Sequence, residues 1–327
     1  MKNTVPVTVV VTTFNDGGLL GEALDSVSAQ RVQPAEIIVL DDGSEPATAP
    51  DIIERRGSAL GSRVRYHRQE NAGPSAARNR GLGMASHPYI AYLDADDRWR
   101  PEHLALKVER MNALPNTYST VYDAFVEFDH ATGRVLKTIA VGAYDGLIAK
   151  ARIGVPGGVP AGMPFQLHRV SALRAIDGFD SALRVNEDFD VLLRLAVEGW
   201  HMAGSSTVTV ERRVHGLSLT SRDPIATLDA TEQFLAKAER LGLLDAEALA
   251  SRRKWARLSA GKKLLEQGGS VDRASNVIAE AFEYAPPLGP AQNVLFAVTR
   301  SRVVARVALG AYGALRRLAA FSGRGAR

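Results

Sequence analysis

Along the first hundred residues, short apolar runs alternate with segments in which apolar positions recur every three or four residues. The first such segment carries Leu20, Ala23, Leu24 and Val27, a spacing typical of an amphipathic helix. Strands are expected at the apolar runs Val7 to Val11, Ile37 to Leu40, Val64 to His67 and Tyr89 to Leu93. This alternation predicts an α/β fold with a Rossmann-like, mostly parallel sheet.

Beyond residue 119 the pattern changes to longer strands and then to helices. Ser119 to Phe128 and Val135 to Val141 are typical of antiparallel strands, and Asp129 to Gly133 supplies the turn. A helix is expected from about Asp188 to Glu198, and residues 224 to 285 have an amphipathic helical pattern. We therefore expect an antiparallel portion beside the parallel sheet, followed by a helical subdomain.

Composition narrows the range of functions. The chain has 327 residues, is 46% hydrophobic and contains no cysteine, which excludes disulfides, thiolate metal sites and cysteine nucleophiles. The apolar stretch near the N-terminus has the features of a first strand and lacks those of a signal peptide. Since no run reaches the ~18 uncharged apolar residues of a membrane-spanning helix, we expect a cytoplasmic protein.

Acidic residues gather at the ends of three predicted elements. They lie in "IIVLDDGS", "YLDADDRW" and "NEDFDVLLRL", and are Asp41, Asp42, Asp94, Asp96, Asp97, Glu187 and Asp188. A helix cap or a solvated turn would explain any one of these motifs. Because the carboxyl ends of parallel strands share one edge of a sheet, all three motifs can meet there. Such a cluster predicts a hard divalent cation, Mn²⁺ or Mg²⁺, which takes carboxylate and phosphate oxygens as ligands.

The stretch "ENAGPSAARNRG" adds an expected anion-binding segment. Gly73 and Pro74 lead into a helix N-terminus, and Arg78 follows within two turns. A diphosphate held there beside a cation is a leaving group whose charge is being neutralised. The sequence thus predicts a nucleotide-diphosphate site at the carboxyl edge of the sheet.

The ordered motifs of this chain resemble those of the inverting family 2 glycosyltransferases, which have the GT-A fold. The matching segments are "VTVVVTTFND", "AEIIVLDDGS", "NAGPSAARNRGL", "YIAYLDADDRWRPEHL", "GFD", "EDFDVLLRL" and "RVHGLSLT". The resemblance implies a metal-dependent hexosyltransferase that moves a sugar from a nucleotide-diphosphate donor, with UDP the expected carrier. The acceptor, which could be a glycan, a lipid or a natural product, stays unidentified.

The same resemblance implies a role for each matching residue. Contacts to the nucleotide and donor sugar would come from Thr13, Phe14, Asn15, Asp42, Asn71, Gly73, Arg78, Asp94 and Glu187. Asp42 would accept a hydrogen bond from the base and Asp94 would hold the ribose. Asp96 and His215 would bind the cation. Asp188 would be the catalytic base, although an acid at that position could also merely complement the helix dipole.

The sequence also predicts a domain organisation, of which the resemblance covers only the first part. Residues 1–222 would form the GT-A catalytic domain, with a nucleotide-binding half at 1–100 and an acceptor-side half at 101–222. Residues 223–327 would form a helical region that ends in a basic amphipathic tail.

Other classes of protein fit the sequence less well. A non-catalytic module that binds a nucleotide sugar is the main alternative, since it would need the same acidic edge. A nicotinamide dehydrogenase should show G-x-G-x-x-G after the first strand, where this chain has "TTFNDGG". A nucleotidyltransferase should have a Gly/Arg/Lys-rich phosphate loop there.

Charge is distributed unequally along the chain. Residues 245 to 327 hold 14 Lys or Arg and 6 Asp or Glu, a net charge of +8, whereas the rest of the chain carries −4. Residues 300 to 327 contain seven Arg and no acid, interleaved with apolar residues. This tail could lie on anionic lipid at the inner face of a membrane, pack on its own helical subdomain or form a homodimer contact. The scarcity of aromatic residues there argues against nucleic acid.

Overall fold

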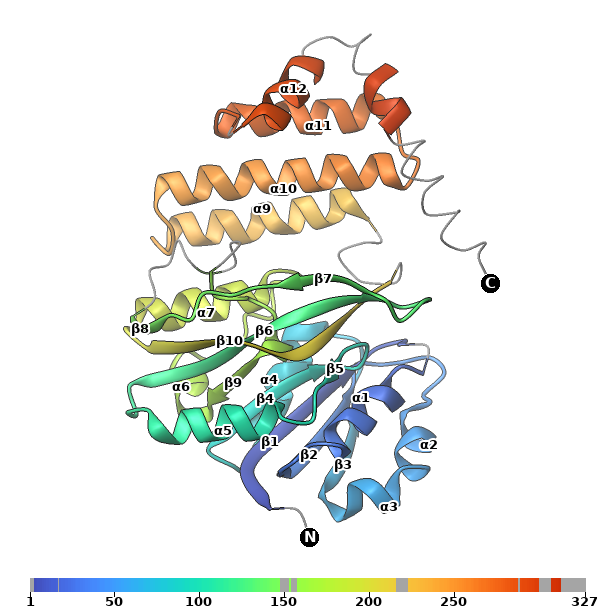
Figure 1. Ribbon diagram of the computed structural model, residues 1–327, viewed down its shortest axis with the longest axis vertical. Coiled ribbons are helices and arrows are strands. Elements are labelled where there is room, and N and C mark those ends of the chain that lie inside the picture. The colour runs from blue at the N-terminus through green and yellow to red at the C-terminus, as the bar shows by residue number, and fades with distance from the viewer. Residues whose placement is uncertain are drawn as a thin grey trace. The chain divides into compact units, whose positions relative to one another are not determined.

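The computed structural model describes residues 3–16, 18–147, 153, 158–215, 223–287, 289–299 and 307–312. It divides the chain into an α/β unit that ends at His215 and a helical unit that begins at Gly216 (Figure 1). Residues 216–222, which the sequence placed in the first domain, lie outside the described residues.

Four parallel strands form the first half of the sheet, in the order β3-β2-β1-β4 (Figure 1). They are β1 (Thr4–Thr13), β2 (Gln33–Asp41), β3 (Val64–Arg68) and β4 (Tyr89–Asp94). The apolar runs of β1, β2 and β4 are buried because helices cover both faces of a doubly wound sheet. The parallel α/β sheet predicted from the alternating pattern is confirmed.

The second half of the sheet mixes strand directions. β9 (Gln166–Arg169) runs antiparallel to both β4 and β6 (Tyr118–Asp129), and β6 runs parallel to β10 (His201–Val214). Three short strands lie at the margins: β5 (Arg98–Trp99), β7 (Val135–Ile139) and β8 (Asp145–Leu147). β7 pairs antiparallel with β6, and β5 and β8 pair antiparallel with β10. The predicted hairpin is thus β6 and β7, while the parallel partner of β6 comes from a segment about 80 residues later.

Helices of the α/β unit cover the sheet and carry the site residues. The bounds are α1 (Leu20–Ser28), α2 (Ala49–Glu54), α3 (Gly57–Leu60), α4 (Pro74–Met84), α5 (His103–Ala113), α6 (Val170–Ala175) and α7 (Glu187–Val197), with single 3₁₀ turns at Gly61–Arg63 and Met163–Phe165. A Cβ on Gly81 would lie 2.6 Å from Val10 Cγ1. Because Gly81 has no side chain, α4 can lie directly against β1. This close packing holds Arg78, one turn earlier on α4, near the strand ends.

The helical unit consists of amphipathic helices with ordinary caps. Its helices include α9 (Pro224–Arg240), α10 (Ala246–Glu266), α11 (Val271–Tyr284) and α12 (Pro290–Thr299). The side chains of Asp223, Asp245 and Ser270 accept backbone N–H bonds at the starts of the first three. Leu265, Ala274 and other apolar residues of α10 and α11 form the core between these two helices. The expected helical subdomain is present.

Of the basic tail, only residues 307–312 are described, and they are helical. The other residues of 300–327, on which the predicted membrane or dimer contact depends, lie outside the described part of the chain. Within the described ranges, no helix is both long enough and apolar enough to cross a bilayer.

Candidate active site

The register of three parallel strands brings the predicted motifs to one edge of the sheet. In the β-ladders, Thr13 of β1 is opposite Asp41 of β2, and Thr12 is opposite Asp94 of β4. Thr12 Oγ1 donates to Asp94 Oδ1 over 3.2 Å, which ties the first motif to the acidic turn. The carboxyl edge of β1, β2 and β4 is therefore the foundation of the site, as the sequence predicted.

Asp42 organises the segment that leads into α4. Its buried carboxylate accepts three bonds, from Gln69 Nε2 (2.8 Å) and from the backbone N–H groups of Ala72 (3.0 Å) and Gly73 (2.9 Å). Asn71 Nδ2 donates to the backbone carbonyl of Asp42 over 3.1 Å. Asp42, Asn71 and Gly73, all predicted to contact the nucleotide or the donor sugar, thus form one cluster.

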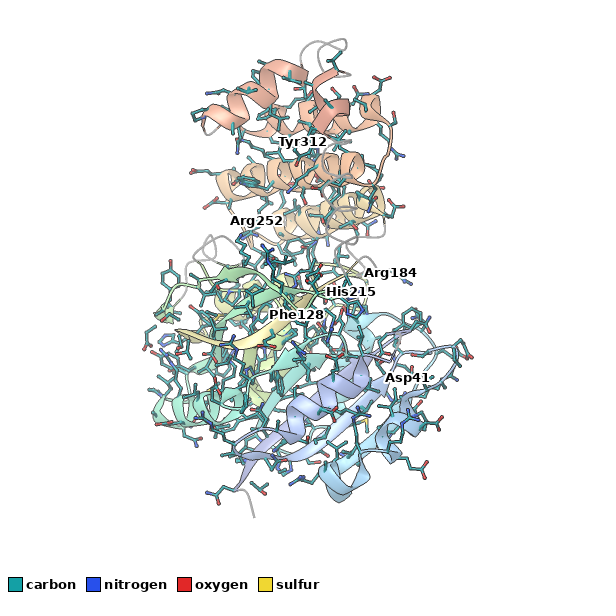
Figure 2. The ribbon with its side chains drawn as sticks, turned by 45° about the vertical axis from the view of Figure 1, so that its right-hand side comes forward. Asp41, Phe128, Arg184, His215, Arg252 and Tyr312 are labelled. Carbon is teal, nitrogen blue, oxygen red and sulfur yellow. The ribbon has the colours of Figure 1, made fainter. Side chains whose placement is uncertain are left out.

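The acid beside it has a structural role. Asp41 is fully buried (labelled in Figure 2), accepts a bond from Ser44 N over 2.8 Å and another from the Tyr66 hydroxyl over 3.0 Å. These bonds fix the turn that presents Asp42 at the end of β2.

The loop after β1 is bound to the loop after β2. Asn15 lies in the left-handed region (φ +48°), where its backbone N–H donates to Ser44 Oγ over 3.0 Å and its Oδ1 accepts from Glu45 N over 2.8 Å. Thr13 Oγ1 donates to Asp16 Oδ2 over 2.7 Å. Phe14, held between these anchored neighbours, leaves 43% of its surface exposed. An exposed aromatic ring at a strand end is suited to stacking on a planar ligand.

Arg78 joins the acidic turn to the start of α7. Its Nη2 donates to Asp94 Oδ1 over 2.9 Å, and its Nη1 donates to Glu187 Oε1. Burial by itself would lower the pKa of Arg78, but the two carboxylates outweigh it and raise that pKa. Arg78 was predicted to contact the nucleotide or the donor sugar; its contacts in the structure are with Asp94 and Glu187, two acids predicted to bind the same donor.

The three acids of the "LDADD" turn have different surroundings. About a third of the side-chain surface of Asp94 and of Asp96 is exposed, whereas Asp97 is buried and accepts the backbone N–H of Arg213 over 2.8 Å. Burial, reinforced by the charge of Asp94, raises the pKa of Asp96, and the His215 hydrogen bond opposes the rise. Burial and the two neighbouring acids raise the pKa of Asp97 well above its ordinary value. The turn concentrates negative charge that a cation would relieve.

Asp96 and His215 meet at the surface of this turn. His215 Nε2 lies 2.8 Å from Asp96 Oδ2, and Figure 2 labels His215 at the end of β10. Neighbouring ligands on an octahedral ion with bonds of about 2.1 Å lie roughly 3 Å apart, so this oxygen and nitrogen have a spacing that suits a shared cation. The described residues offer no cluster of three or more acids or histidines for a metal.

Asp188 stands in the first turn of α7. Its Oδ1 accepts the backbone N–H of Phe189 over 2.8 Å, while Leu192 and Leu195 on the same helix are fully buried in the core. Burial and the adjacent Glu187 raise the pKa of Asp188 to about 7, against the opposing charge of Arg78. A carboxyl group with a pKa near neutrality is matched to general-base chemistry.

Sequence reasoning did not single out Arg213, Glu22 or His130. Arg213 donates to Glu22 Oε2 over 2.7 Å and to His130 Nδ1 over 3.1 Å, and Arg213 itself bonds to Asp96 and Asp97 of the acidic turn. One signal was present, because Arg213 lies only two residues before His215 in the chain. Nothing local in the sequence connects Glu22 with a strand 190 residues later.

This α/β fold with a mostly parallel central sheet is shared with GT-A type glycosyltransferases, which are structural neighbours of this chain. Residues 8–165 match the family described as Glycosyl transferase family 2. The α/β unit is therefore a family 2 glycosyltransferase domain.

Two solved structures illustrate the fold. TarS residues 1–349 from S. aureus, in complex with UDP-GlcNAc, superposes with a TM-score of 0.61 at 16% identity, over 98% of this chain and 92% of that one. The mannosyltransferase PcManGT from Pyrobaculum calidifontis, in complex with GDP-Man and Mn²⁺, gives a TM-score of 0.58 at 21% identity, over 92% and 86% of the two chains.

Among curated proteins, the succinoglycan biosynthesis protein ExoO of Rhizobium meliloti is 30% identical over 198 residues, 57% of this chain and 54% of ExoO. An uncharacterized glycosyltransferase of Rickettsia bellii is 25% identical over 194 residues, 58% of this chain and 27% of that protein. The chain thus spans about half or less of the length of these relatives.

Proposed function

We propose that this protein is an inverting, metal-dependent glycosyltransferase that moves a hexose from a nucleotide-diphosphate sugar, with UDP as carrier, to an acceptor hydroxyl or amine. The observation that carries the proposal is the state of Asp188. Its carboxyl group has a pKa of about 7, and Glu187 and Arg78 connect it to the acidic turn. A base poised at neutral pH beside a cation-binding turn is what acceptor activation requires.

The donor would bind along the edge formed by β1, β2 and β4. The exposed ring of Phe14 is placed to stack on the base, with Thr13 and Asn15 beside it in a loop fixed by hydrogen bonds. Asp42, Asn71 and Gly73 would complete the base pocket, Asp94 would hold the ribose, and Glu187 would contact the donor sugar. TarS and PcManGT, bound to UDP-GlcNAc and GDP-Man respectively, support a nucleotide-sugar donor while differing in its base.

Asp96 and His215 would hold the divalent cation. Their atoms are spaced as ligands of one ion, and one carboxylate oxygen with one imidazole nitrogen is a donor set compatible with Mn²⁺. When bound, the cation supplies charge neutralisation for the diphosphate leaving group. Because Asp96 and His215 supply only these two atoms, further ligands would come from phosphate oxygens and water.

The chain's own residues would carry out the proton transfer. Asp188 would accept the acceptor's proton as the acceptor oxygen or nitrogen forms its bond to the anomeric carbon. The bond from that carbon to the diphosphate oxygen breaks on the opposite face, and its electron pair leaves with the diphosphate. One displacement of this kind inverts the anomeric configuration.

Ligand-dependent melting tests the binding half of the proposal. The purified protein would be melted with UDP, GDP or other nucleotide diphosphates, in Mn²⁺, in Mg²⁺ and in chelator. A ligand at ~100 times its dissociation constant adds ~2.7 kcal/mol of stability. We expect a shift with one nucleotide that disappears in chelator and in Asp96→Ala. No shift with any nucleotide would contradict the proposal.

Slow hydrolysis of the donor tests the catalytic half. Asp188→Asn should keep the melting shift but lower turnover by about 10²- to 10⁴-fold, the usual contribution of a general base. Asp51→Asn, which changes another acid in the first turn of a helix, is the matched control. Binding without any turnover in the unchanged protein would instead favour the alternative, a non-catalytic nucleotide-sugar binding module.

A further inference from the structure

We infer that Arg213 is a positioning residue that holds Asp96 and His215 in the arrangement that a divalent cation requires. The inference rests on the proposed function, and on the bonds that Arg213 makes to the acidic turn. Arg213 Nε donates to the backbone carbonyl of Asp96 over 2.8 Å, and its backbone N–H donates to Asp97 Oδ1 over 2.8 Å. Only 4% of its side-chain surface is exposed.

Asp96 is thereby held at two points by residues at the end of β10. Arg213 binds its backbone carbonyl, and His215, which directly follows the strand, binds its carboxylate. Because both residues contact the same acid, the brace and the predicted metal ligand are presented together. The position of Asp96 relative to His215 therefore depends on how firmly Arg213 is held.

The acidic turn needs such a brace because its carboxylates repel one another. Asp94, Asp96 and Asp97 lie within four positions, and a backbone bond from Asp97 N to Asp94 O closes the turn over 3.0 Å. Repulsion among these acids favours an opened turn whenever no cation is bound. Arg213 brings a fixed positive charge against the backbone of this turn through its bond to the Asp96 carbonyl, while the Asp96 carboxylate bonds to His215.

Arg213 is itself restrained through the rest of its guanidinium. Nη2 donates to Glu22 on α1, and Nη1 donates to His130 Nδ1 in the β6–β7 turn, where His130 must accept because arginine has no acceptor. The guanidinium carbon also lies 4.7 Å from the centre of the Phe128 ring, which Figure 2 labels. A lysine could not make these contacts at once, because only a planar fork has donors in several fixed directions.

Arg98 provides a matched control. It pairs with the same Glu22 (3.3 Å), and its guanidinium carbon lies 4.3 Å from the same Phe128 ring. Its other ion pair is with Glu211 (2.9 Å), away from the carbonyl of Asp96. Replacing Arg98 removes a similar charge and similar packing, and leaves the bond from Arg213 to Asp96 in place.

The test is Mn²⁺ binding to the full chain, followed by the electron paramagnetic resonance signal of free Mn²⁺ with saturating UDP or GDP. Arg213→Met, which keeps the apolar stem over Phe128, and Arg213→Lys should raise the Mn²⁺ dissociation constant about 10- to 100-fold, the usual effect of losing a residue that orients a metal ligand. Arg98→Met and Arg98→Lys should stay within about threefold of the unchanged protein. In chelator and without nucleotide, all five proteins should melt cooperatively, which shows that each of them is folded.

The outcomes distinguish the positioning role of Arg213 from the proposed metal-dependent function on which it rests. Equal weakening of Mn²⁺ binding in the Arg213 and Arg98 variants, or none in either, overturns the role of Arg213 and leaves the proposed function intact. Absence of Mn²⁺ binding in the unchanged protein, with either nucleotide, overturns the proposed metal site as well. If Arg213→Met fails to fold, Arg213→Lys against Arg98→Lys gives the same comparison with the charge retained.

Discussion

Arg78 and Glu187, 109 positions apart in the sequence, form a buried ion pair between α4 and the first turn of α7. The same guanidinium also binds Asp94 at the end of β4. Two segments that the sequence assigned to different parts of the site are thus one electrostatic unit. The catalytic base proposed at Asp188 adjoins this unit, so its chemistry depends on the geometry of Arg78.

Removing the Arg78 charge should destabilise the α/β unit. Arg78→Met leaves Glu187 buried and Asp94 partly buried without their cation, which should lower the free energy of unfolding by about 3 kcal/mol. Arg80→Met is the control, because the Arg80 guanidinium is on the same helix and its described bond is an exposed one to the Arg68 carbonyl. Urea unfolding measures the free energy of unfolding of both variants. Similar losses of stability in the two would contradict the role of Arg78 as the cation of a buried ion-pair network.

The pH dependence of turnover should report Asp188. Since its folded pKa is about 7, the base is ionised above that pH and protonated below it. Turnover should therefore fall about tenfold per pH unit on the acid side of pH 7. A rate profile for the unchanged protein measures this limb, and constant turnover from pH 5.5 to 8 would rule out Asp188 as the titrating base.

Asp188 should also make the free energy of unfolding depend on pH. The folded protein keeps this proton up to about pH 7, whereas the unfolded chain releases it near pH 4. Between these values the unfolded chain binds fewer protons, so the contribution of Asp188 to stability falls as pH rises and is constant above pH 7. In Asp188→Asn this decline should be absent, which a series of urea titrations from pH 4 to pH 8 would show.

Two glycines of α4 should respond in opposite directions to alanine. A Cβ at Gly81 would lie 2.6 Å from Val10 Cγ1, so Gly81→Ala should cost about 1–3 kcal/mol through overpacking. Gly83, on the same helix, has nothing within 4 Å of its Cβ position, and Gly83→Ala should stabilise by up to about 1 kcal/mol. Thermal melts of the two variants give the comparison, and a shared sign would contradict the packing of α4 on β1.

A buried lysine should behave as one half of a pair. Lys107 is 1% exposed, lies 3.0 Å from Asp123 Oδ2 and donates to the Phe165 carbonyl over 2.7 Å. Lys107→Met should lower the free energy of unfolding by about 3–5 kcal/mol because Asp123 is left buried and unpaired by a cation. Lys137→Met, on the exposed strand β7, should have little effect.

A double replacement tests the coupling directly. Lys107→Met combined with Asp123→Leu should cost less than the sum of the two single changes, since no lone charge then stays buried. Urea unfolding of the four proteins in this cycle measures the difference, and simple additivity would contradict the pairing.

The local pattern of the sequence predicts much of this fold. Apolar runs mark β1, β2 and β4 because each is buried on both faces, and Pro74 marks the start of α4. Where the sequence-based prediction differs from the structure, a contact with a residue distant in the chain accounts for the difference. β2 begins at Gln33, ahead of its apolar run, and therefore includes Glu36, a buried acid that accepts a hydrogen bond from Thr8 of β1. From the sequence alone, Lys107 is typical of a solvent-exposed helix residue. The structure buries it beside Asp123 of β6, its partner in an ion pair.

The candidate site shows the same division. The order of the motifs predicted that Asp42, Asn71 and Gly73 lie at one site, together with Arg78 and the acids of the turn, because these segments follow the ends of β2, β3 and β4. The hydrogen bonds within these two groups agree with that placement. Arg213 and Glu22 went unnoticed because their contact depends on how β10 lies beside the acidic turn, which no local pattern encodes. Non-local ion pairs were the part of the site beyond the reach of sequence reasoning.

The ladder of β10 sets where this strand can change length. Between Ser205 and Val210, β10 has three more residues than the segment of β6 that it opposes, Asp123 to Phe125, and the end of the strand is still in regular register. From Val210 to Val214 the pairing with β6 is regular. An insertion or deletion between Val210 and Val214 would shift this register and displace His215, which directly follows the strand, from Asp96. Engineered insertions in this strand should therefore be tolerated at the exposed residues 206 and 207 and should disrupt the site after Val210.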